Sequence, residues 1–414
     1  MSPETALHHS TILEESIRVR DELLVVENVV EEAAHEARLN CLPGVRERLG
    51  YAPLDTDHAQ DLIDTRIESK QTVIAPESLA EALPVTKEGA ATTRIARAAI
   101  EAILHGDDDR LVVIVGPCSI HDPEAALEYA SHVIAWRESY GNDLEIIMRA
   151  YMEKPRTELG WKGFVYDPLL DESDDINLGL VATRMLTSQI VNTGVPTGME
   201  RLNALTPQYV NGLVAYDAIG MRNTTDQKAR EYGSGTSSPV GFKNTAEGER
   251  SVLSAAEAVV TARGPHAFLG VGMNNTTKQI ETTGNDSAHI ILRGDADGPN
   301  YEAEHINRAI KVLGQKGLLQ AIIVDASHGN SRKKAANQQK VIADVARQVH
   351  DGQQAIKGVM IESFLLGGNQ KLIPGKSREL KYGQSITDEC VSIDETDVML
   401  GMLAHALHKR RKAD

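Results

Sequence analysis

Short apolar runs rich in Val and Ile alternate with longer amphipathic stretches from Leu111 onward. The runs are LVVIVG (111–116), LEIIMRA (144–150), VPTGME (195–200), YDAIGM (216–221), PVGFKN (239–244), HAFLGV (266–271), HIILRG (289–294), LQAIIVDAS (319–327) and GVMIES (358–363). Strands that are apolar along their whole length are typical of parallel sheets, in which both faces are buried. The alternation therefore predicts an α/β protein, either a closed (β/α)8 barrel or a doubly wound sheet.

The nine runs exceed by one the number of strands that a (β/α)8 barrel takes. The run at 266–271 is followed by GMNNTTKQIETTGN, which is rich in turn residues and lacks a helical period. We therefore interpret residues 266–284 as a two-stranded β-hairpin inserted before the sixth barrel strand. Asp122-Pro123 and Thr206-Pro207 each predict a helix start, because a capping side chain there precedes a proline at the first helical position.

A (β/α)8 barrel needs roughly 250 residues, so this chain of 414 residues carries additional segments. Residues 11–40 place a broad apolar face among many acids and predict a helix that ends at CLPG. A second helix is predicted from about residue 92 to Gly106, where glycine provides the stop signal. Three parts are predicted: an N-terminal helical extension (1–60), an arm and helix (61–110) and the catalytic barrel (111–414).

Composition restricts the class of protein. The net charge of −16 argues against a general nucleic-acid binder, because phosphate backbones require clustered positive charge. No apolar run approaches the roughly 20 residues that span a bilayer, and the first residues do not resemble a secretory signal. The three cysteines show no framework spacing, which indicates a reducing environment. We therefore expect a cytoplasmic protein that binds neither nucleic acid nor membrane.

Each of the eight predicted barrel strands ends in a side chain able to take part in chemistry. These residues are Cys118, Arg149, Glu200, Arg222, Lys243, Arg293, His328 and Glu362. In a barrel the strand ends converge on one mouth, where barrel enzymes have their active site, whereas a doubly wound sheet spreads them along an edge. The pattern favours the barrel and an enzyme together.

One set of these residues is cationic. Any single Lys or Arg is most simply explained as solvated surface, but Arg149 and Arg293 directly continue apolar strands. A buried cation without a partner is costly, so it predicts an anionic ligand. The set is completed by Lys154, Arg156, Arg222 and Lys243. So many cations suggest two anionic groups, such as two phosphates or a phosphate and a carboxylate, and the absence of a P-loop disfavours a nucleoside triphosphate.

The second set combines sulfur, nitrogen and oxygen donors. Its members are Cys118, His328, Glu362 and, after the last strand, Asp388 in SITDEC. Taken singly, each could be structural, because a lone cysteine is most often a small buried hydrophobe. Together they suit a divalent metal such as Mn²⁺ or Fe²⁺ with an open position rather than a structural zinc site. The rival interpretation is a nucleophilic cysteine paired with His328, which leaves the cations unexplained.

The same residues carry a family resemblance. The segments GPCSIHDP, MRAYMEKPRTELGWKGFVYDP, PVGFKN, HIILRG, DASHGNS, GVMIES, GGNQ and YGQSITD resemble the type I 3-deoxy-D-arabino-heptulosonate 7-phosphate synthases, from about Arg66 to the C-terminus. The resemblance implies a metal-dependent transferase with a (β/α)8 TIM barrel. It implies that the enzyme condenses phosphoenolpyruvate with erythrose 4-phosphate, releases phosphate and so begins the shikimate pathway of aromatic amino acid biosynthesis.

The resemblance also implies roles for individual residues. The implied metal ligands are Cys118, His328, Glu362 and Asp388, with Mn²⁺, Fe²⁺ or Co²⁺ as the metal. The implied phosphoenolpyruvate site comprises Arg149, Lys154, Arg222, Lys243 and Arg293, and the erythrose-phosphate end comprises Arg156 and Thr157. The implied catalytic residues are Lys154, Glu200 and His328, with Lys154 protonating the developing alkoxide and Glu200 positioning the attacking water. A homodimer or homotetramer is expected, and residues 1–60 are interpreted as an oligomerisation or docking helix, with an inert solvated extension as the alternative.

Several segments depart from the family pattern. GMRNTTDQ stands where G-A-R-T-T-E-S-Q is usual, GMERLN where G-E-F-L-D is usual, and TAEG follows PVGFKN in place of G-T-D-G. The family binds a feedback inhibitor, Phe, Tyr or Trp, near the hairpin, and there Gly270 stands where a hydroxyl is common. The alternatives to the synthase are a paralogue that condenses phosphoenolpyruvate with another aldose phosphate in secondary metabolism, and a barrel that only binds metabolites or a partner.

Overall fold

Eight parallel strands close into a barrel in the computed structural model, which describes residues 11–49 and 62–413. The barrel strands are β1 (Leu111–Gly116), β2 (Leu144–Arg149), β3 (Thr197–Arg201), β4 (Val214–Ile219), β5 (Val240–Lys243), β8 (His289–Leu292), β9 (Ile322–Asp325) and β10 (Ile356–Glu362). Their order around the barrel is β1-β10-β9-β8-β5-β4-β3-β2. The (β/α)8 barrel is confirmed, and the doubly wound sheet is excluded.

Six of the eight barrel strands are buried along their whole length, and β1 illustrates why. Val112 and Ile114 belong to the apolar cluster inside the barrel, whereas Val113 and Val115 pack outward against the helices. Successive side chains of a strand point to opposite sides, so a strand that is covered on both sides must be apolar throughout. The unbroken LVVIVG run follows from this requirement.

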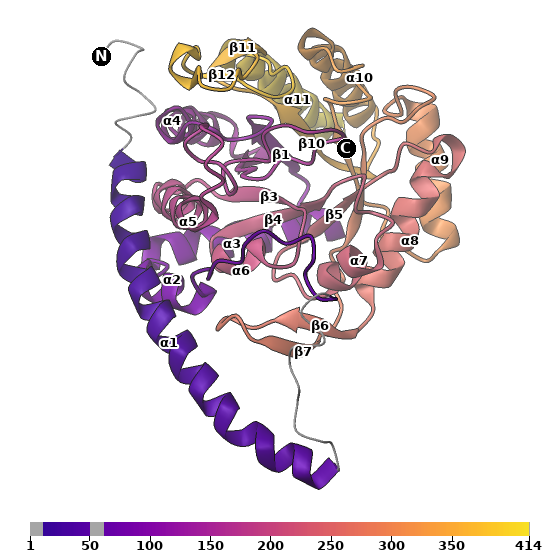
Figure 1. Cartoon of the computed structure of the whole chain (residues 1–414). Coiled ribbons are helices and arrows are strands. Elements are labelled where there is room, and N and C mark those ends of the chain that lie inside the picture. The colour runs from indigo at the N-terminus through magenta and orange to yellow at the C-terminus, as the bar shows by residue number, and fades with distance from the viewer. Residues whose placement is uncertain (1–10, 50–61, 414) are drawn as a thin grey trace.

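Helices surround the barrel (Figure 1). They are α4 (Pro123–Tyr140), α5 (Ile176–Asn192), α6 (Thr206–Tyr209), α7 (Gln227–Ser234), α8 (Ser251–Arg263), α9 (Ala303–Gln315), α10 (Gln338–His350) and α11 (Ile393–Ala413). Asp122 caps α4 as predicted and accepts from the backbone N–H groups of Glu124 and Ala125. The predicted cap at Thr206 is wrong: Thr206 lies inside α6, and Asn203 Oδ1 accepts from its N–H instead.

Helix α3 (Lys87–His105) lies across the amino-terminal ends of the strands. Its apolar face, with Ile100 and Ile103, joins the cluster inside the barrel. The Arg97 guanidinium donates to the carbonyl oxygen of Val214, the first residue of β4. The helix ends at Gly106, which has the left-handed φ of 92° expected of a glycine stop. Helix α3 therefore closes the barrel at the end opposite the strand tips.

The N-terminal helix α1 (Thr11–Leu49) packs against α5 and extends beyond the barrel (Figure 1). Ile12 and Leu13 are buried. The predicted end at CLPG is wrong, because the helix continues through Pro43. A proline removes a single backbone donor, and the helix-forming residues on both sides of Pro43 continue the helix. The predicted extension 1–60 also includes residues 1–10 and 50–60, which lie outside the described residues.

The hairpin lies outside the barrel, as predicted. Strands β6 (Ala267–Val271) and β7 (Thr277–Glu281) pair antiparallel. The turn between them contacts the arm that precedes the barrel, where Asn275 Nδ2 donates to the Val73 carbonyl at 2.8 Å. The remaining elements are α2 (Pro76–Ala82), the strand pair β11 (Leu366–Asn369) and β12 (Gln384–Ser385), and the 3-10 turns η3 (Gly248–Arg250), η4 (Ala335–Asn337) and η5 (Ser377–Glu379).

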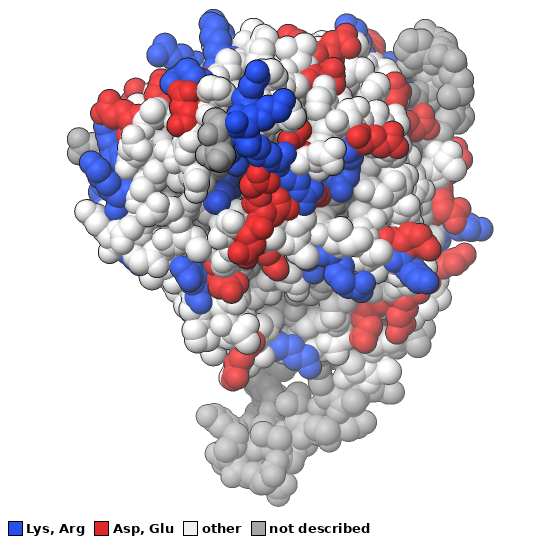
Figure 2. Space-filling view, turned by 180° about the vertical axis from the view of Figure 1, so that it is seen from behind, with Lys and Arg blue, Asp and Glu red and all other residues white. Residues whose placement is uncertain are grey.

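The surface carries charges of both signs. In the view from behind, Lys and Arg side chains lie interspersed with Asp and Glu (Figure 2). None of the helices in the described part of the chain is both long and apolar enough to cross a bilayer.

Candidate active site

The carboxyl ends of the barrel strands surround a cavity of about 450 Å³. Every residue assigned to a site from the sequence lines it. These residues are Cys118, Arg149, Lys154, Arg156, Thr157, Glu200, Arg222, Lys243, Arg293, His328, Glu362 and Asp388. The predicted convergence on one mouth is therefore observed, while the roles of the individual residues remain predictions.

Cys118 is placed at the cavity by the tight end of β1. A Cβ atom on Gly116 would lie 2.9 Å from the Arg149 carbonyl oxygen, and Gly116 has a φ of 155°. Only glycine lets β1 approach β2 so closely there. Two residues later Cys118 is 1% exposed. Burial, followed by repulsion from Glu362, raises the pKa of the Cys118 thiol to about 11.

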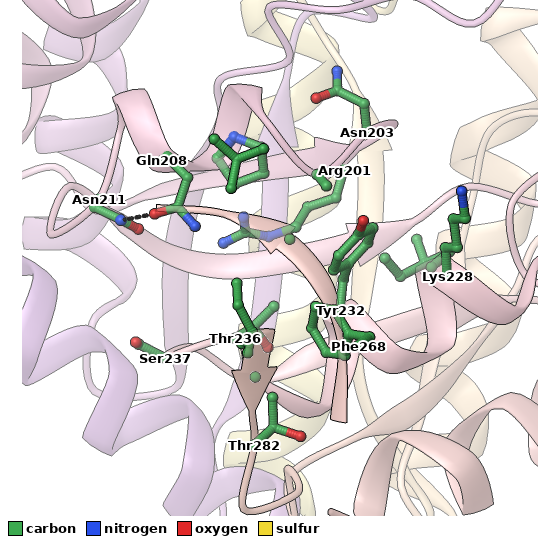
Figure 3. Close-up of a pocket in the computed structure, with 18 of the residues that line it drawn as sticks. Arg201, Asn203, Gln208, Asn211, Lys228, Tyr232, Thr236, Ser237, Phe268 and Thr282 are labelled. Carbon is green, nitrogen blue, oxygen red and sulfur yellow. Dashed lines mark hydrogen bonds between the residues drawn. The ribbon is translucent and has the colours of Figure 1, made fainter. Parts of the chain in front are cut away.

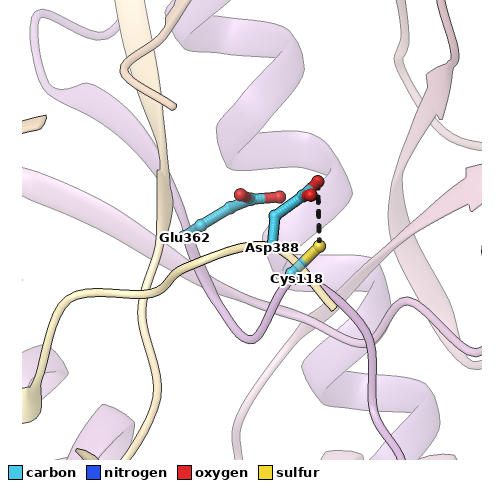
Figure 4. Close-up of side chains that lie close together, drawn as sticks. All are labelled: Cys118, Glu362 and Asp388. Carbon is cyan, nitrogen blue, oxygen red and sulfur yellow. Dashed lines mark hydrogen bonds between the residues drawn. The ribbon is translucent and has the colours of Figure 1, made fainter. Parts of the chain in front are cut away.

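Cys118, Glu362 and Asp388 form a compact group of donors (Figure 4). Their sulfur and carboxylate oxygens lie within 4.8 Å of one another, and Cys118 Sγ lies 3.6 Å from Asp388 Oδ2. His328 stands beside them, with its Nε2 atom 3.6 Å from Glu362 Oε1. Two carboxylates beside a thiol and an imidazole match the mixed donors of a divalent transition-metal site. The donor set therefore fits the metal that the resemblance implies.

Lys154 contacts two members of this group. Its Nζ atom lies 2.8 Å from Cys118 Sγ and 3.0 Å from Asp388 Oδ2. Burial alone would raise the pKa of Asp388, but the Lys154 ammonium lowers it to about 2. Burial alone would lower the pKa of Lys154, and the surrounding anions raise it instead. An ionised carboxylate and an ammonium therefore face each other beside the thiol.

Arg149 reaches the bottom of the cavity from β2. It is 1% exposed, its Nη2 donates to Glu362 Oε1 at 3.1 Å, and its guanidinium carbon lies 3.9 Å from the centre of the Tyr151 ring. Its Nη1 atom is buried and finds no hydrogen-bond partner among the described residues. A buried donor of this kind costs free energy until an acceptor meets it, so the cavity is prepared for an anion at Nη1.

Lys243 occupies the neighbouring position at the end of β5. It is 3% exposed, and its Nζ lies 3.2 Å from Glu200 Oε1 and 3.5 Å from Asp325 Oδ2. Burial alone would raise the pKa of Glu200, but the Lys243 ammonium lowers it. Glu200 is therefore held as a carboxylate against a fixed cation.

The remaining cations lie nearer to solvent. Arg156, Thr157 and Arg222 are exposed at the rim, where the Arg222 guanidinium donates to Thr157 Oγ1 at 2.5 Å. Arg293 is 9% exposed, and its backbone N–H donates to Asn244 Oδ1. The site thus has a buried cationic floor, formed by Arg149 and Lys243, and an exposed cationic rim, formed by Arg156 and Arg222. This arrangement suits two anionic groups at different depths.

Sequence reasoning missed three residues that belong to this region. Tyr151 lies beneath Arg149, and Lys333 lines the rim of the cavity. Asp325, which ends β9, contacts both Lys243 and His328. Only Asp325 left a signal in the sequence, since an acid terminates the apolar run IIVD; Tyr151 is one aromatic in a mostly apolar stretch, and Lys333 stands among several basic residues.

A second cavity, of about 500 Å³, lies on the outside of the barrel beneath the hairpin (Figure 3). Hairpin residues, α7 and the segments around β3 and β4 form its walls. The rings of Tyr232 and Phe268 meet edge to face at 4.9 Å between centroids. Charged groups of both signs also line it: Arg97, Arg201, Asp226, Lys228 and Glu281. The combination suits a small zwitterion with an aromatic side chain.

Comparison with known proteins supports a family assignment. Residues 81–400 match the model of the DAHP synthetase I family. The chain is 46% identical to "Phospho-2-dehydro-3-deoxyheptonate aldolase, Phe-sensitive" of Escherichia coli, over 84% of this chain and 98% of that protein. It is 42% identical to the Trp-sensitive protein of Salmonella typhimurium, over 86% and 99%. The solved structure of phospho-2-dehydro-3-deoxyheptonate aldolase from Francisella tularensis is 44% identical with a TM-score of 0.81, and the match covers 83% of this chain and 99% of that one.

Proposed function

The chain belongs to the DAHP synthetase I family of enzymes, and from this membership we propose that it condenses phosphoenolpyruvate with erythrose 4-phosphate. The products would be 3-deoxy-D-arabino-heptulosonate 7-phosphate and inorganic phosphate, which begins the shikimate pathway. One structural observation supports this reaction independently of the family membership. A sulfur and oxygen donor group and a buried guanidinium with an unpartnered N–H face the same cavity.

The two depths of the cavity accommodate the two substrates. Arg149 and Lys243 form the buried floor, and with Arg293 they would hold phosphoenolpyruvate through its phosphate and carboxylate. Arg156 and Thr157 stand at the rim, where the phosphate of the aldose would bind, and Arg222 beside Thr157 would complete the phosphoenolpyruvate site with Lys154. Fixing two mutually repelling polyanions in one orientation lowers the entropic part of the barrier.

The donor group would hold the metal through Cys118, Glu362, Asp388 and the adjacent His328. When bound there, a divalent ion supplies Lewis acidity that polarises the aldehyde carbonyl. Cys118 and Asp388 lie against the Lys154 ammonium, so this lysine stands ready beside the place where the aldehyde oxygen becomes an alkoxide.

The residues of the chain complete the proton and water steps. As C3 of phosphoenolpyruvate bonds to the aldehyde carbon, Lys154 donates a proton to the aldehyde oxygen. Water then adds at C2, with the Glu200 carboxylate accepting a hydrogen bond from it. One proton of this water restores the Lys154 ammonium. The C2–O bond to phosphate breaks as the added hydroxyl becomes the C2 ketone, and the hydroxyl proton leaves with inorganic phosphate from the cationic floor.

The chelator experiment tests the proposal. Phosphate release from phosphoenolpyruvate is expected only after erythrose 4-phosphate is added, and it should stop when a chelator removes the metal and resume when Mn²⁺ is restored. Phosphate release that ignores the chelator would contradict the metal's role. A panel of aldose phosphates of different lengths would reveal a paralogue, which would prefer an acceptor other than erythrose 4-phosphate.

We also propose that the cavity beneath the hairpin binds an aromatic amino acid as a feedback inhibitor. Its support is the Tyr232–Phe268 ring pair together with charges of both signs in one cavity. The curated relatives are described as Phe-sensitive and Trp-sensitive. The inhibitor of this chain would be identified by measuring turnover with Phe, Tyr and Trp in turn.

Substituting Gly270 by valine should relieve this inhibition. The first carbon added at Gly270 would lie 2.4 Å from Ile280 Cδ1, among the side chains that line the cavity, so the added side chain would occupy ligand space. We expect a higher inhibitor concentration for half-inhibition and unchanged turnover without inhibitor. Leu269→Val is the matched control, because Leu269 is 77% exposed on the same strand. Equal inhibition of both variants and the parent would contradict the assignment.

A further inference from the structure

Asp325 occupies the space between the donor group and the cationic floor. It ends β9 and is fully buried. The Ser327 backbone N–H and hydroxyl both donate to its Oδ1 atom, at 3.0 and 2.6 Å. Its Oδ2 atom faces two cations or potential cations, His328 Nδ1 at 2.9 Å and Lys243 Nζ at 3.5 Å. One buried carboxylate therefore contacts a residue from each half of the site.

The contact with His328 fixes which ring nitrogen faces the donor group. The Nδ1 atom lies 2.7 Å from Ser327 Oγ as well as 2.9 Å from Asp325 Oδ2. Because the Ser327 hydroxyl donates its hydrogen to Asp325, it presents only lone pairs to the ring. The Ser327 oxygen, itself held by Asp325, therefore accepts the proton of Nδ1, and the Asp325 carboxylate stands at ion-pair distance from the same nitrogen. The Nε2 lone pair is left facing Glu362, 3.6 Å away. A cation between the His328 Nε2 lone pair and the Glu362 carboxylate oxygen would be favoured by both groups.

The contact between Asp325 and Lys243 holds the Lys243 ammonium in position in the cationic floor. The Lys243 ammonium lies between two carboxylates, those of Glu200 and Asp325. Asp325 Oδ2 in turn lies within 3.5 Å of Lys243 Nζ and 2.9 Å of His328 Nδ1, and a cation at this distance favours the charged form of a carboxyl group. Its charge offsets the buried ammonium and leaves it directed at the cavity.

We propose that Asp325 is a positioning residue that orients His328 toward the metal and Lys243 toward phosphoenolpyruvate, an inference that rests on the proposed metal site. Carboxylates behind metal-binding histidines act in this way in other proteins, where their loss typically weakens metal binding about 10- to 100-fold. Asp325 does not touch the donor atoms of Cys118 or Asp388, so its effect passes through His328 and Lys243.

A purely structural role for the side chain is the alternative. The loop after β9 is, however, tied down through main-chain atoms, because Asn330 Nδ2 donates to the carbonyl oxygens of Leu292 and Asp325. These bonds do not involve the carboxylate. Replacing the carboxylate by an amide of the same shape therefore removes the charge and the preference for Nδ1–H while keeping the loop anchored.

The test measures metal binding by the full chain after chelation. Asp325→Asn is expected to bind Mn²⁺ about 10- to 100-fold more weakly than the parent and to change the visible spectrum of the Co²⁺ complex, which reports the ligand arrangement. At saturating metal, the KM for phosphoenolpyruvate should rise because Lys243 has lost one of its two carboxylates. Ser327→Ala should shift metal affinity in the same direction by a smaller factor, and it carries the test if the asparagine variant does not fold.

Asp217→Asn is the matched control. Asp217 is a barrel-strand carboxylate that is 1% exposed and paired with Arg201, but it faces away from the donor group, in contact with Ser238. This variant should retain the metal affinity and Co²⁺ spectrum of the parent whatever its loss of thermal stability. Equal weakening in both variants, or none in Asp325→Asn, would overturn the positioning role. A parent chain that binds no Mn²⁺ would instead overturn the proposed metal site.

Discussion

Replacing Cys118 with alanine is expected to abolish tight metal binding while leaving the barrel folded. The substitution removes the only sulfur of the donor group and leaves two carboxylates that still pair with Arg149 and Lys154. Without the thiolate the site loses its soft ligand. Metal content of the purified protein and titration with Mn²⁺ should both show the loss, and phosphate release should fall to background.

Cys390→Ala provides the control for this variant. Cys390 is also a buried thiol, and it lies next to Asp388, with its Sγ 3.8 Å from the Asp388 carbonyl oxygen. It is outside the donor group, so its removal should preserve metal content and turnover. Circular dichroism and thermal melting would establish that both variants are folded. A Cys118→Ala protein with full activity would refute the proposed ligand set.

Replacing Lys154 with methionine is expected to separate catalysis from metal binding. Loss of a positioned general acid typically costs 10²- to 10⁴-fold in rate, so kcat should fall by about that factor. Metal affinity should be maintained or increased, because the variant removes a cation that lies 2.8 Å from Cys118 Sγ and 3.0 Å from Asp388 Oδ2. Steady-state kinetics and Mn²⁺ titration measure the two effects independently.

Lys162→Met is the matched substitution in the same loop. Lys162 has an exposed side chain, whose Nζ lies 3.4 Å from Asp174 Oδ1 and 5.2 Å from the centre of the Tyr166 ring, and it does not line the cavity. It should leave kcat near the parent value. Should Lys154→Met lose metal in step with activity, the lysine would be holding the donor group together rather than supplying the proton.

The strands were predictable because a strand that is buried on both faces appears in the sequence as an unbroken apolar run. Residues 111–116 form β1 at the predicted bounds, and the other barrel strands fall within about three residues of the predicted runs. The hairpin was predictable from its turn residues. The continuation of α1 through Pro43 was not, since the local signal for a helix end was strong and was overridden by the segments on either side.

The site residues were predictable where a charged side chain interrupts an apolar strand. Arg149 and Glu362 are of this kind, and both line the cavity. The contact between Asp325 and Lys243 links β9 to β5, and no spacing in the sequence specifies which strand tips face one another across a barrel. The cavity beneath the hairpin is likewise formed by packing between segments distant in the sequence, such as Tyr232 and Phe268.

Helix α3 closes one end of the barrel, so in the described part of the chain the cavity opens toward the carboxyl ends of the strands. Ile100 and Ile103 fill the far end, so nothing can pass through the barrel from behind. We therefore expect a ligand at Arg149 on the floor to bind before one that occupies the rim at Arg156 and Thr157. On the proposed reaction, the second substrate would then cover the first, and we expect inorganic phosphate formed on the floor to leave after the sugar product.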